Sequence, residues 1–233
     1  MNIDIKRISF TAAKGSWRIA YRLVKWLLIV CLAIMLGFTW FAVSSLPSLQ
    51  PWHTQRLAGE FKAYKDSDID FDTYMRREAI LFENMQTEIA GWDQTEEAFI
   101  YSRFNRASNF DRLAEGAPFN RSFRWTVANP KGHALLIHGL TDSPYSMKAM
   151  AETLHARGFD ITVLRLPGHG TLPSMMTEMS LRDWNAAVRI AARDVASRTP
   201  PGQPFYLAGH STGGTLSLLY ALDALDDKSL RMP

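Results

Sequence analysis

Gly209-His210-Ser211-Thr212-Gly213 is the stretch that decides the fold of this chain of 233 residues. An apolar run at 205–208 predicts a buried strand before it, and the apolar periodicity of 212–225 predicts a helix after it. A serine between such a strand and helix sits in a tight, strained turn, so the residues two positions away must be nearly free of side chain. Gly209 and Gly213 meet that need. The stretch therefore predicts a nucleophile elbow with Ser211 as the nucleophile.

A second buried strand is predicted at 134–138, where the apolar run Ala-Leu-Leu-Ile ends in His138 and Gly139. Ser143 suits an N-cap and Pro144 the first helical position, so we expect a helix to begin there and to end at Gly158. Three apolar residues are expected on one side of this helix, namely Met147, Met150 and Leu154.

The two strand ends together predict an oxyanion hole. In acyl-transfer sites of this kind, one backbone N–H donor follows a His-Gly pair at a strand end, and the other follows the nucleophile. In this chain the two donors would be Leu140 and Thr212.

The elements between these strands alternate in type. The sequence predicts a short strand at 123–127, another at 159–164, and a helix that Ser180 and Asp183 cap and that runs through Val195. Alternating strands and helices favour a mostly parallel sheet with helices on both faces. The loops that carry Leu140, His169 and Ser211 would then gather at the carboxyl ends of the strands.

Residues 133–218 resemble the α/β-hydrolase superfamily, and within it bacterial carboxylesterases and monoacylglycerol-lipase-like enzymes. Four motifs carry the resemblance in the family's order, and they are His138-Gly139, Pro167-Gly168-His169-Gly170, Asp183-Trp184 and Gly209-His210-Ser211-Thr212-Gly213-Gly214. The resemblance implies a serine hydrolase that forms an acyl-enzyme on Ser211 and needs neither a cofactor nor a metal. It implies a small-molecule ester or a lipid-like substrate.

The chain departs from the family where the triad acid and histidine are expected, because the 22 residues after Ser211 contain no histidine. His138 and His210 flank the two turns, and the resemblance gives them structural roles. His169 is the internal alternative for the base, since its loop leaves a strand at the same sheet edge. The other interpretation is that the His169 imidazole hydrogen-bonds to the loop backbone and holds the loop over the site.

We therefore expect a hydrolase domain that is only partly present, inactive as it stands, and open at the far side of the strand at 205–208. Two functions stay possible. One is a membrane-anchored serine esterase or lipase, and the other is a non-catalytic hydrolase-like module that binds a ligand or partner at the membrane surface. These residues do not separate ester, lipid, thioester and peptide substrates, and they identify no protein partner.

The N-terminal residues predict where in the cell the protein is located. Trp26–Val43 is an uncharged, largely apolar stretch of 18 residues, which spans about 27 Å as a helix against a hydrocarbon core of about 30 Å. Residues 1–25 carry six basic side chains and one acidic one. This asymmetry predicts a single-pass inner-membrane protein with a cytoplasmic N-terminus and a hydrolase domain on the periplasmic or extracellular side. A signal peptide cleaved near Ala42-Val43-Ser44 and a buried core helix are the alternatives.

The domain order predicted is a basic tail at 1–25, an anchor at 26–43, a helical linker or cap at 44–120 and the partial hydrolase domain at 121–233. Within the third segment, helices are expected at 70–89 and 99–113. The formal net charge of +3 resides in the tail, so the remainder is slightly acidic and shows no basic stripe of the kind that binds nucleic acid. The lone Cys31 lies in the anchor, which excludes a disulfide within the external part.

Overall fold

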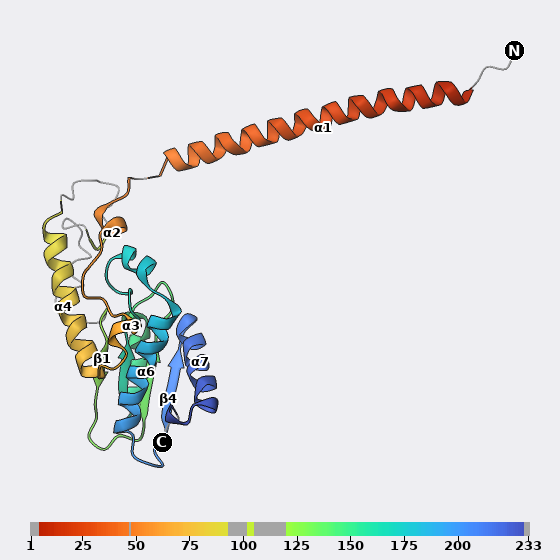
Figure 1. Cartoon of the computed structure of the whole chain (residues 1–233). Helices are drawn as coiled ribbons and strands as arrows, with labels where there is room; N and C mark the ends of the chain where they lie inside the picture. The colour runs from red at the N-terminus through yellow and green to blue at the C-terminus, as the bar shows by residue number, and fades with distance from the viewer. Residues whose placement is uncertain (1–4, 47, 93–101, 105–119, 231–233) are drawn as a thin grey trace. The chain divides into compact units, whose positions relative to one another are not determined.

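The computed structural model describes residues 5–46, 48–92, 102–104 and 120–230. The chain divides into two compact units, Met1–Ser48 and Leu49–Pro233. The first unit contains one long helix, and the second contains the sheet and the remaining helices (Figure 1). The four segment boundaries given by the sequence stay a prediction.

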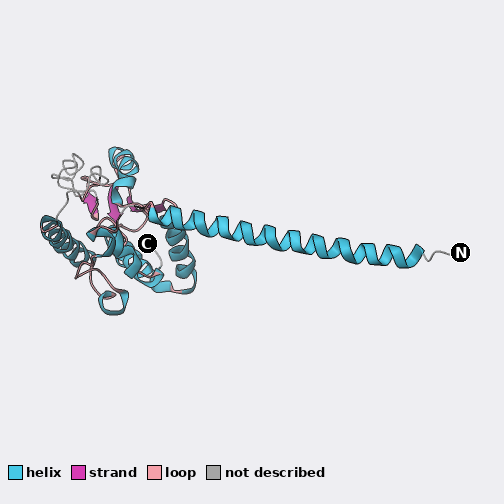
Figure 2. Cartoon of the chain, turned by 90° about the horizontal axis from the view of Figure 1, so that it is seen from above, coloured by secondary structure: helices cyan, strands magenta, loops and turns pink. Residues whose placement is uncertain are grey.

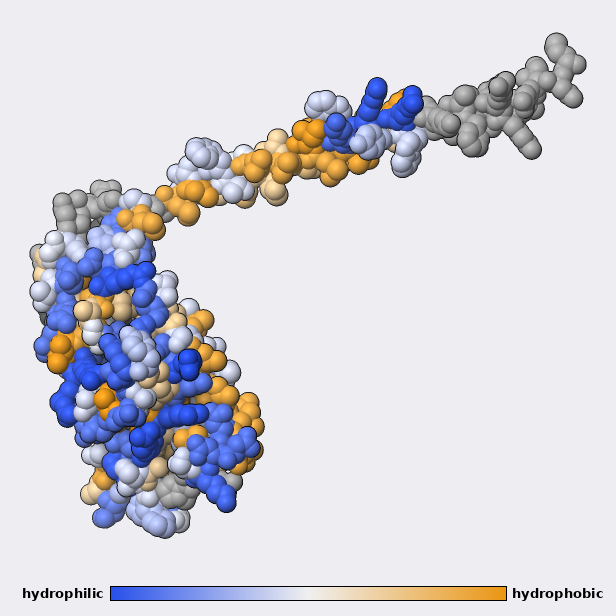
Figure 3. All heavy atoms as spheres, in the orientation of Figure 1, coloured by the Kyte–Doolittle hydropathy of each residue, from blue (hydrophilic) through white to orange (hydrophobic). Residues whose placement is uncertain are grey.

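The long helix α1 runs from Ile5 to Ser44. Its stretch Trp17–Ser44 has a mean hydropathy of 2.4 and is long and apolar enough to cross a membrane. Figure 3 shows this stretch as mostly apolar spheres with a hydrophilic group toward its N-terminal end. None of the side chains of this stretch is buried within its own unit.

The sheet has four strands in the order β1-β3-β2-β4. They are β1 (Phe123–Trp125), β2 (His133–Ile137), β3 (Asp160–Leu164) and β4 (Phe205–Gly209). β2 pairs parallel with both β3 and β4, and β1 pairs antiparallel with β3. The register places Ile137 opposite Leu164 and Gly209, so three parallel strands end at one level. This confirms the mostly parallel sheet and brings the following loops together.

Helices cover both faces of the sheet, as the sequence predicts (Figure 2). Successive strand residues point to opposite faces, and in β2 the four residues after His133 are apolar and fully buried on both faces. Leu135 and Ile137 pack with α6 (Leu181–Arg198) and α7 (Thr212–Asp226), while Leu136 packs with α5 (Lys148–Ala156). Ser180 and Asp183 form the capping box expected at the start of α6.

The segment after β2 differs from the sequence prediction. A 3₁₀ turn, η3 (Pro144–Met147), comes first, and the α-helix begins only at Lys148. The Ser143 hydroxyl does not cap this turn, because it donates instead to the Asn120 side chain at 2.6 Å. Met147 and Ala151 are buried, whereas Met150 is 46% exposed.

Residues 49–92 belong to the same compact unit as the sheet. They form α2 (Pro51–Thr54), α3 (Ala63–Asp66) and α4 (Phe71–Ala90). The last of these is the helix expected at 70–89, and the Asp70 carboxylate caps it by accepting from the Thr73 N–H at 2.6 Å. Phe71 and Tyr74 are buried in the same apolar cluster as Ile137. The second expected helix, at 99–113, lies almost wholly outside the described residues.

Two further 3₁₀ turns complete the described elements. Turn η4 (Pro173–Glu178) follows the loop after β3, and η5 (Lys228–Leu230) follows α7.

Candidate active site

Ser211 lies between β4 and α7, and its backbone conformation is one that residues other than glycine rarely adopt. Its φ is 50° and its ψ is −117°. Asn129 is the other residue with positive φ among the described non-glycine residues, and it lies in the turn before β2. A non-glycine residue keeps such a strained conformation only where the surrounding structure enforces it. Residues of this kind are concentrated at functional sites.

The two glycines of the stretch permit the close approach that holds this turn. A Cβ on Gly213 would lie 2.6 Å from the His138 carbonyl oxygen, and a Cβ on Gly209 would lie 2.5 Å from the Gly214 nitrogen. Both obstacles are backbone atoms, which cannot rotate away. In addition, the His210 N–H donates to the Ile137 carbonyl at 3.0 Å. The turn is therefore pressed against the end of β2.

This contact brings the two predicted oxyanion donors to the same place. A Cβ built on Gly139 would lie 3.5 Å from the Ser211 Cβ, so the loop that carries Leu140 runs beside the serine. Neither the Leu140 N–H nor the Thr212 N–H donates to an acceptor among the described residues. Two backbone donors next to a serine hydroxyl can stabilise an oxyanion that forms on a carbonyl attacked by that hydroxyl.

The His138 ring fixes the direction of the Leu140 N–H. Its Nδ1 lies 2.8 Å from the Gly139 carbonyl oxygen, and its Nε2 accepts from the Leu166 N–H at 3.0 Å. The ring is thus neutral, with the proton on Nδ1, and burial lowers its pKa to about 3. The Gly139 carbonyl and the Leu140 N–H belong to one trans peptide plane and point in opposite directions. Holding the carbonyl therefore aims the N–H.

The His169 ring holds the next peptide plane. Its Nε2 lies 2.7 Å from the Leu140 carbonyl oxygen, and its Nδ1 lies 3.0 Å from the Pro167 carbonyl oxygen. Burial lowers the pKa of His169, although the two carbonyls favour a protonated ring. Trp184 Nε1 also donates to the Pro167 oxygen, at 3.0 Å. These contacts favour the backbone-holding interpretation over a role as base.

His210 and Asp142 lie at the exposed side of the same loops. The His210 Nδ1 is 3.6 Å from the Asp142 carboxylate, and the histidine side chain is largely exposed. Asp142 received no role from the sequence, because a carboxylate in a loop after a strand is usually a solvated residue.

No histidine hydrogen-bonds to the Ser211 hydroxyl in the part of the chain that the structure describes, which includes all six histidines. His53 caps α2, the buried His133 begins β2, and His155 lies against the Thr126 carbonyl. The described residues therefore bring no histidine to the serine that the sequence predicts as the nucleophile. They also hold no group of three or more side chains suited to a metal ion.

The sequence missed one polar cluster next to this site. Arg165, the residue after β3, is fully buried with Glu60 and Glu78, which come from the segment before the sheet. The sequence carries one indication of this cluster, which is the position of Arg165 between Leu164 and Leu166 at the end of a buried strand. A buried guanidinium requires carboxylate partners, so acidic residues could have been expected nearby.

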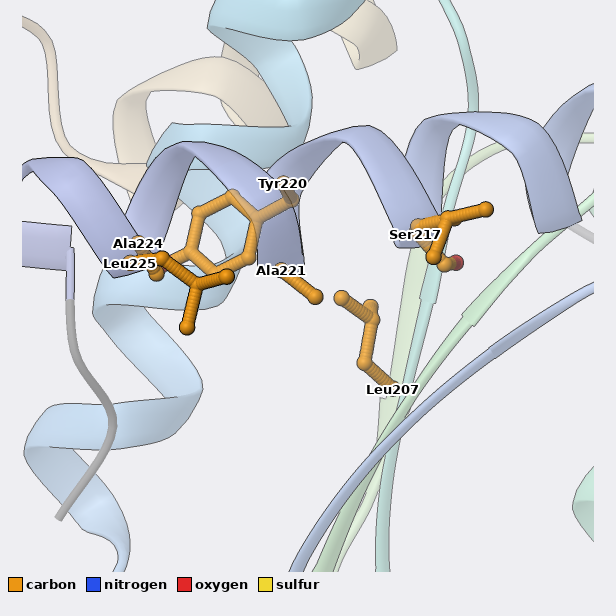
Figure 4. A pocket seen from close by; sticks show the side chains of 7 residues that line it. Leu207, Ser217, Tyr220, Ala221, Ala224 and Leu225 are labelled. Carbon is orange, nitrogen blue, oxygen red and sulfur yellow. The ribbon is translucent and has the colours of Figure 1, made fainter.

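A groove of about 490 Å³ lies elsewhere, between β4 and α7 (Figure 4). None of its lining residues belongs to the candidate site, and they are Leu207, Ser217, Leu218, Tyr220, Ala221, Ala224 and Leu225.

Known proteins resemble this region. Residues 128–230 match the family model Hydrolase_4, described as serine aminopeptidase, S33. A thermostable monoacylglycerol lipase from Bacillus sp. (strain H-257) is 37% identical over 87 residues, which is 37% of this chain and 34% of the lipase. Esterase PIR7B from Oryza sativa subsp. japonica is 30% identical over 101 residues, which is 43% of this chain and 37% of the esterase.

A solved structure from work on LipS and LipT, two metagenome-derived lipolytic enzymes, is 29% identical with a TM-score of 0.41. That similarity covers 47% of this chain and 42% of the other. The chain spans about a third of the length of the curated relatives it matches.

Proposed function

Residues 128–230 belong to the α/β-hydrolase superfamily, and on this basis we propose that the protein is a membrane-anchored serine hydrolase that cleaves carboxylic esters at Ser211. The observation that carries the proposal is the strained Ser211 beside the backbone N–H groups of Leu140 and Thr212, which donate to no acceptor among the described residues. The names of the two curated relatives, a monoacylglycerol lipase and an esterase, support a small ester or lipid-like substrate.

In the proposed reaction, the Ser211 Oγ bonds to the ester carbonyl carbon while a base takes the hydroxyl proton. The carbonyl oxygen becomes an oxyanion that accepts hydrogen bonds from the Leu140 and Thr212 N–H groups. The alcohol leaves with the proton, and water then hydrolyses the acyl-enzyme. We assign the base to a histidine other than the six of this sequence, because both ring nitrogens of His138 and of His169 lie against backbone groups.

A fluorophosphonate probe tests the nucleophile, since such probes bond covalently to activated serines. We expect the complete protein to be labelled at Ser211 and the Ser211→Ala variant to lose labelling. Ser217→Ala is the matched control, because that hydroxyl lies on α7 and donates to the Gly213 carbonyl. Labelling that survives in Ser211→Ala would assign the chemistry to another serine.

The absence of a base among the described residues favours one second candidate, a hydrolase-like module that binds without catalysis. The two functions differ in turnover by the complete protein. Hydrolysis of a short-chain nitrophenyl ester that depends on Ser211 supports the enzyme, whereas binding without turnover or labelling supports the module.

The location is proposed from α1. Its apolar stretch and the basic residues before it support a cytoplasmic N-terminus and a domain on the opposite side of the inner membrane. A reporter fused after Pro233 tests the orientation. Activity of a reporter that functions only in the cytoplasm would contradict it.

A further inference from the structure

Arg165 is the most deeply buried charge in the described part of the molecule, and it lies next to the candidate site rather than in it. Its side chain is 1% exposed. Nη1 and Nη2 donate to the two Glu60 oxygens at 3.0 and 2.8 Å, and Nε donates to Glu78 at 2.9 Å. A planar guanidinium can satisfy both carboxylates at once, because its donors form a fixed fork.

The pair of Glu60 and Arg165 also binds the backbone of the 165–169 loop. The Glu60 Oε2 accepts from the Gly168 N–H at 3.0 Å, and Arg165 Nη1 donates to the His169 carbonyl at 2.8 Å. Glu78 acts through Ser122, whose hydroxyl donates to Glu78 at 3.0 Å and accepts from the Arg165 N–H at 2.8 Å. Residues 165–169 are therefore fastened by groups that come from outside the sheet.

The same loop holds both peptide planes at Leu140. The Leu166 N–H donates to His138, and the His169 ring lies against the Leu140 carbonyl. Glu60 and Arg165 thus hold the loop whose Leu166 N–H and His169 ring hold the two peptide planes that flank Leu140, and the Leu140 N–H is one of the two proposed oxyanion donors.

We infer that Glu60 and Glu78 are positioning residues of the active site, which act through Arg165 to hold the 165–169 loop and so to aim the Leu140 N–H. The segment 49–92 is then a required part of the site rather than a spacer between the helix α1 and the sheet. The kinetic part of this inference rests on the proposed function, and its structural part does not.

The two glutamates are expected to differ. Burial raises the pKa of Glu60, but the charge and hydrogen bonds of Arg165 outweigh it and the pKa is lowered. Burial raises the pKa of Glu78, and Arg165 offsets this only in part. In addition, each Glu60 oxygen accepts from two N–H groups. In Glu60→Gln one of these oxygens becomes an NH₂ group, which would face two N–H donors and could accept from neither. Glu60→Gln should therefore disturb the loop more than Glu78→Gln.

The test measures hydrogen exchange and ester hydrolysis on the complete protein in detergent. Glu60→Gln is expected to speed amide exchange at Leu166, Gly168 and His169, and to lower kcat by about 10 to 100-fold with KM within about 3-fold. An oxyanion donor acts in the transition state, so its misplacement reduces kcat rather than substrate binding. Glu78→Gln should give the same pattern with a smaller change.

Asp66→Asn is the matched control. This buried carboxylate also comes from the segment before the sheet, but it binds the Lys62 N–H and Arg77. It should leave exchange at 166–169 and kcat within about 2-fold of the wild type. Wild-type exchange and kcat in Glu60→Gln, or changes equal to those of Asp66→Asn at equal Tm, would overturn the inference.

If Glu60→Gln does not accumulate as folded protein, the amide exchange at 166–169 and the kcat of Glu78→Gln test the inference instead. The exchange data need no activity, so they test the loop even where Ser211→Ala shows that the proposed function is wrong.

Discussion

The two loops beside Ser211 are held by different forces. The Leu140 loop is fixed by buried hydrogen bonds that run through two histidines and an arginine with its carboxylates. The Thr212 turn is fixed by steric contact, because two glycines let the start of α7 press on the ends of β2 and β4. One donor of the proposed oxyanion hole thus depends on polar pairing, and the other depends on the absence of side chains.

Their surroundings differ as well. The strand β2 is buried at every position, whereas β4 is an edge strand whose residues are only partly buried. Tyr206 is 51% exposed, and Leu218, which is 62% exposed, lines the groove of Figure 4 together with Leu207. The polar side of the site is therefore enclosed, while the glycine side borders an apolar surface. Each side should respond to a different perturbation.

The largest effect is expected on the glycine side. Gly213→Ala places a Cβ against the Ile137 and His138 carbonyls, and since neither atom can move away we expect a loss of about 4 kcal/mol in the free energy of unfolding. Gly214→Ala is the control, because its nearest obstacle is the Gly209 oxygen at 3.2 Å. Denaturant unfolding of both variants measures the difference. Equal stability of the two would show that steric contact does not hold this turn.

The polar side should respond to pH. His138 has a folded pKa of about 3 against an ordinary value of 6.5, so protonation favours the unfolded chain. Its stabilising contribution is complete above pH 6.5 and is lost as the pH falls from 6.5 toward 3. Between pH 6 and pH 5 this loss is about 1 kcal/mol.

His138→Gln should remove that part of the slope when unfolding is measured at several pH values. His155→Gln is the control, because the His155 ring lies at the surface against the Thr126 carbonyl. A slope that stays the same in His138→Gln would assign the acid sensitivity to other groups.

The smallest effect on stability is expected at the apolar surface. Leu218→Lys and Leu225→Lys replace exposed side chains, so each should change the free energy of unfolding by less than about 0.5 kcal/mol. Both should nevertheless reduce self-association, since an exposed apolar patch beside an edge strand favours contacts between chains. Light scattering at increasing protein concentration measures this. Unchanged scattering would show that the apolar surface around Leu218 and Leu225 does not contribute to self-association.

The sequence predicted what depends on local pattern. The four strands, the helices at 70–89 and 180–195 and the strand-turn-helix around Ser211 follow from apolar periodicity and capping residues. The late start of α5 could not be read in this way, because the Ser143 hydroxyl binds Asn120, 23 residues earlier in the chain.

The site was predictable only where its residues belong to one motif. The sequence placed Leu140, His169 and Ser211 at one sheet edge because parallel strands end together. It gave no role to Glu60 or Glu78, since a glutamate in a polar segment has the pattern of a solvated residue whether or not a distant arginine buries it.

The pairing of Arg165 with Glu60 and Glu78 also sets an order of events during synthesis. The arginine follows its partners by 105 and 87 residues. At a translation rate of about 5 to 20 residues per second, both carboxylates wait for about 5 to 20 s before their cation emerges. The nascent chain cannot bury either carboxylate favourably during that interval. The 165–169 loop can therefore be fastened to the segment before the sheet only after β3 has been synthesised.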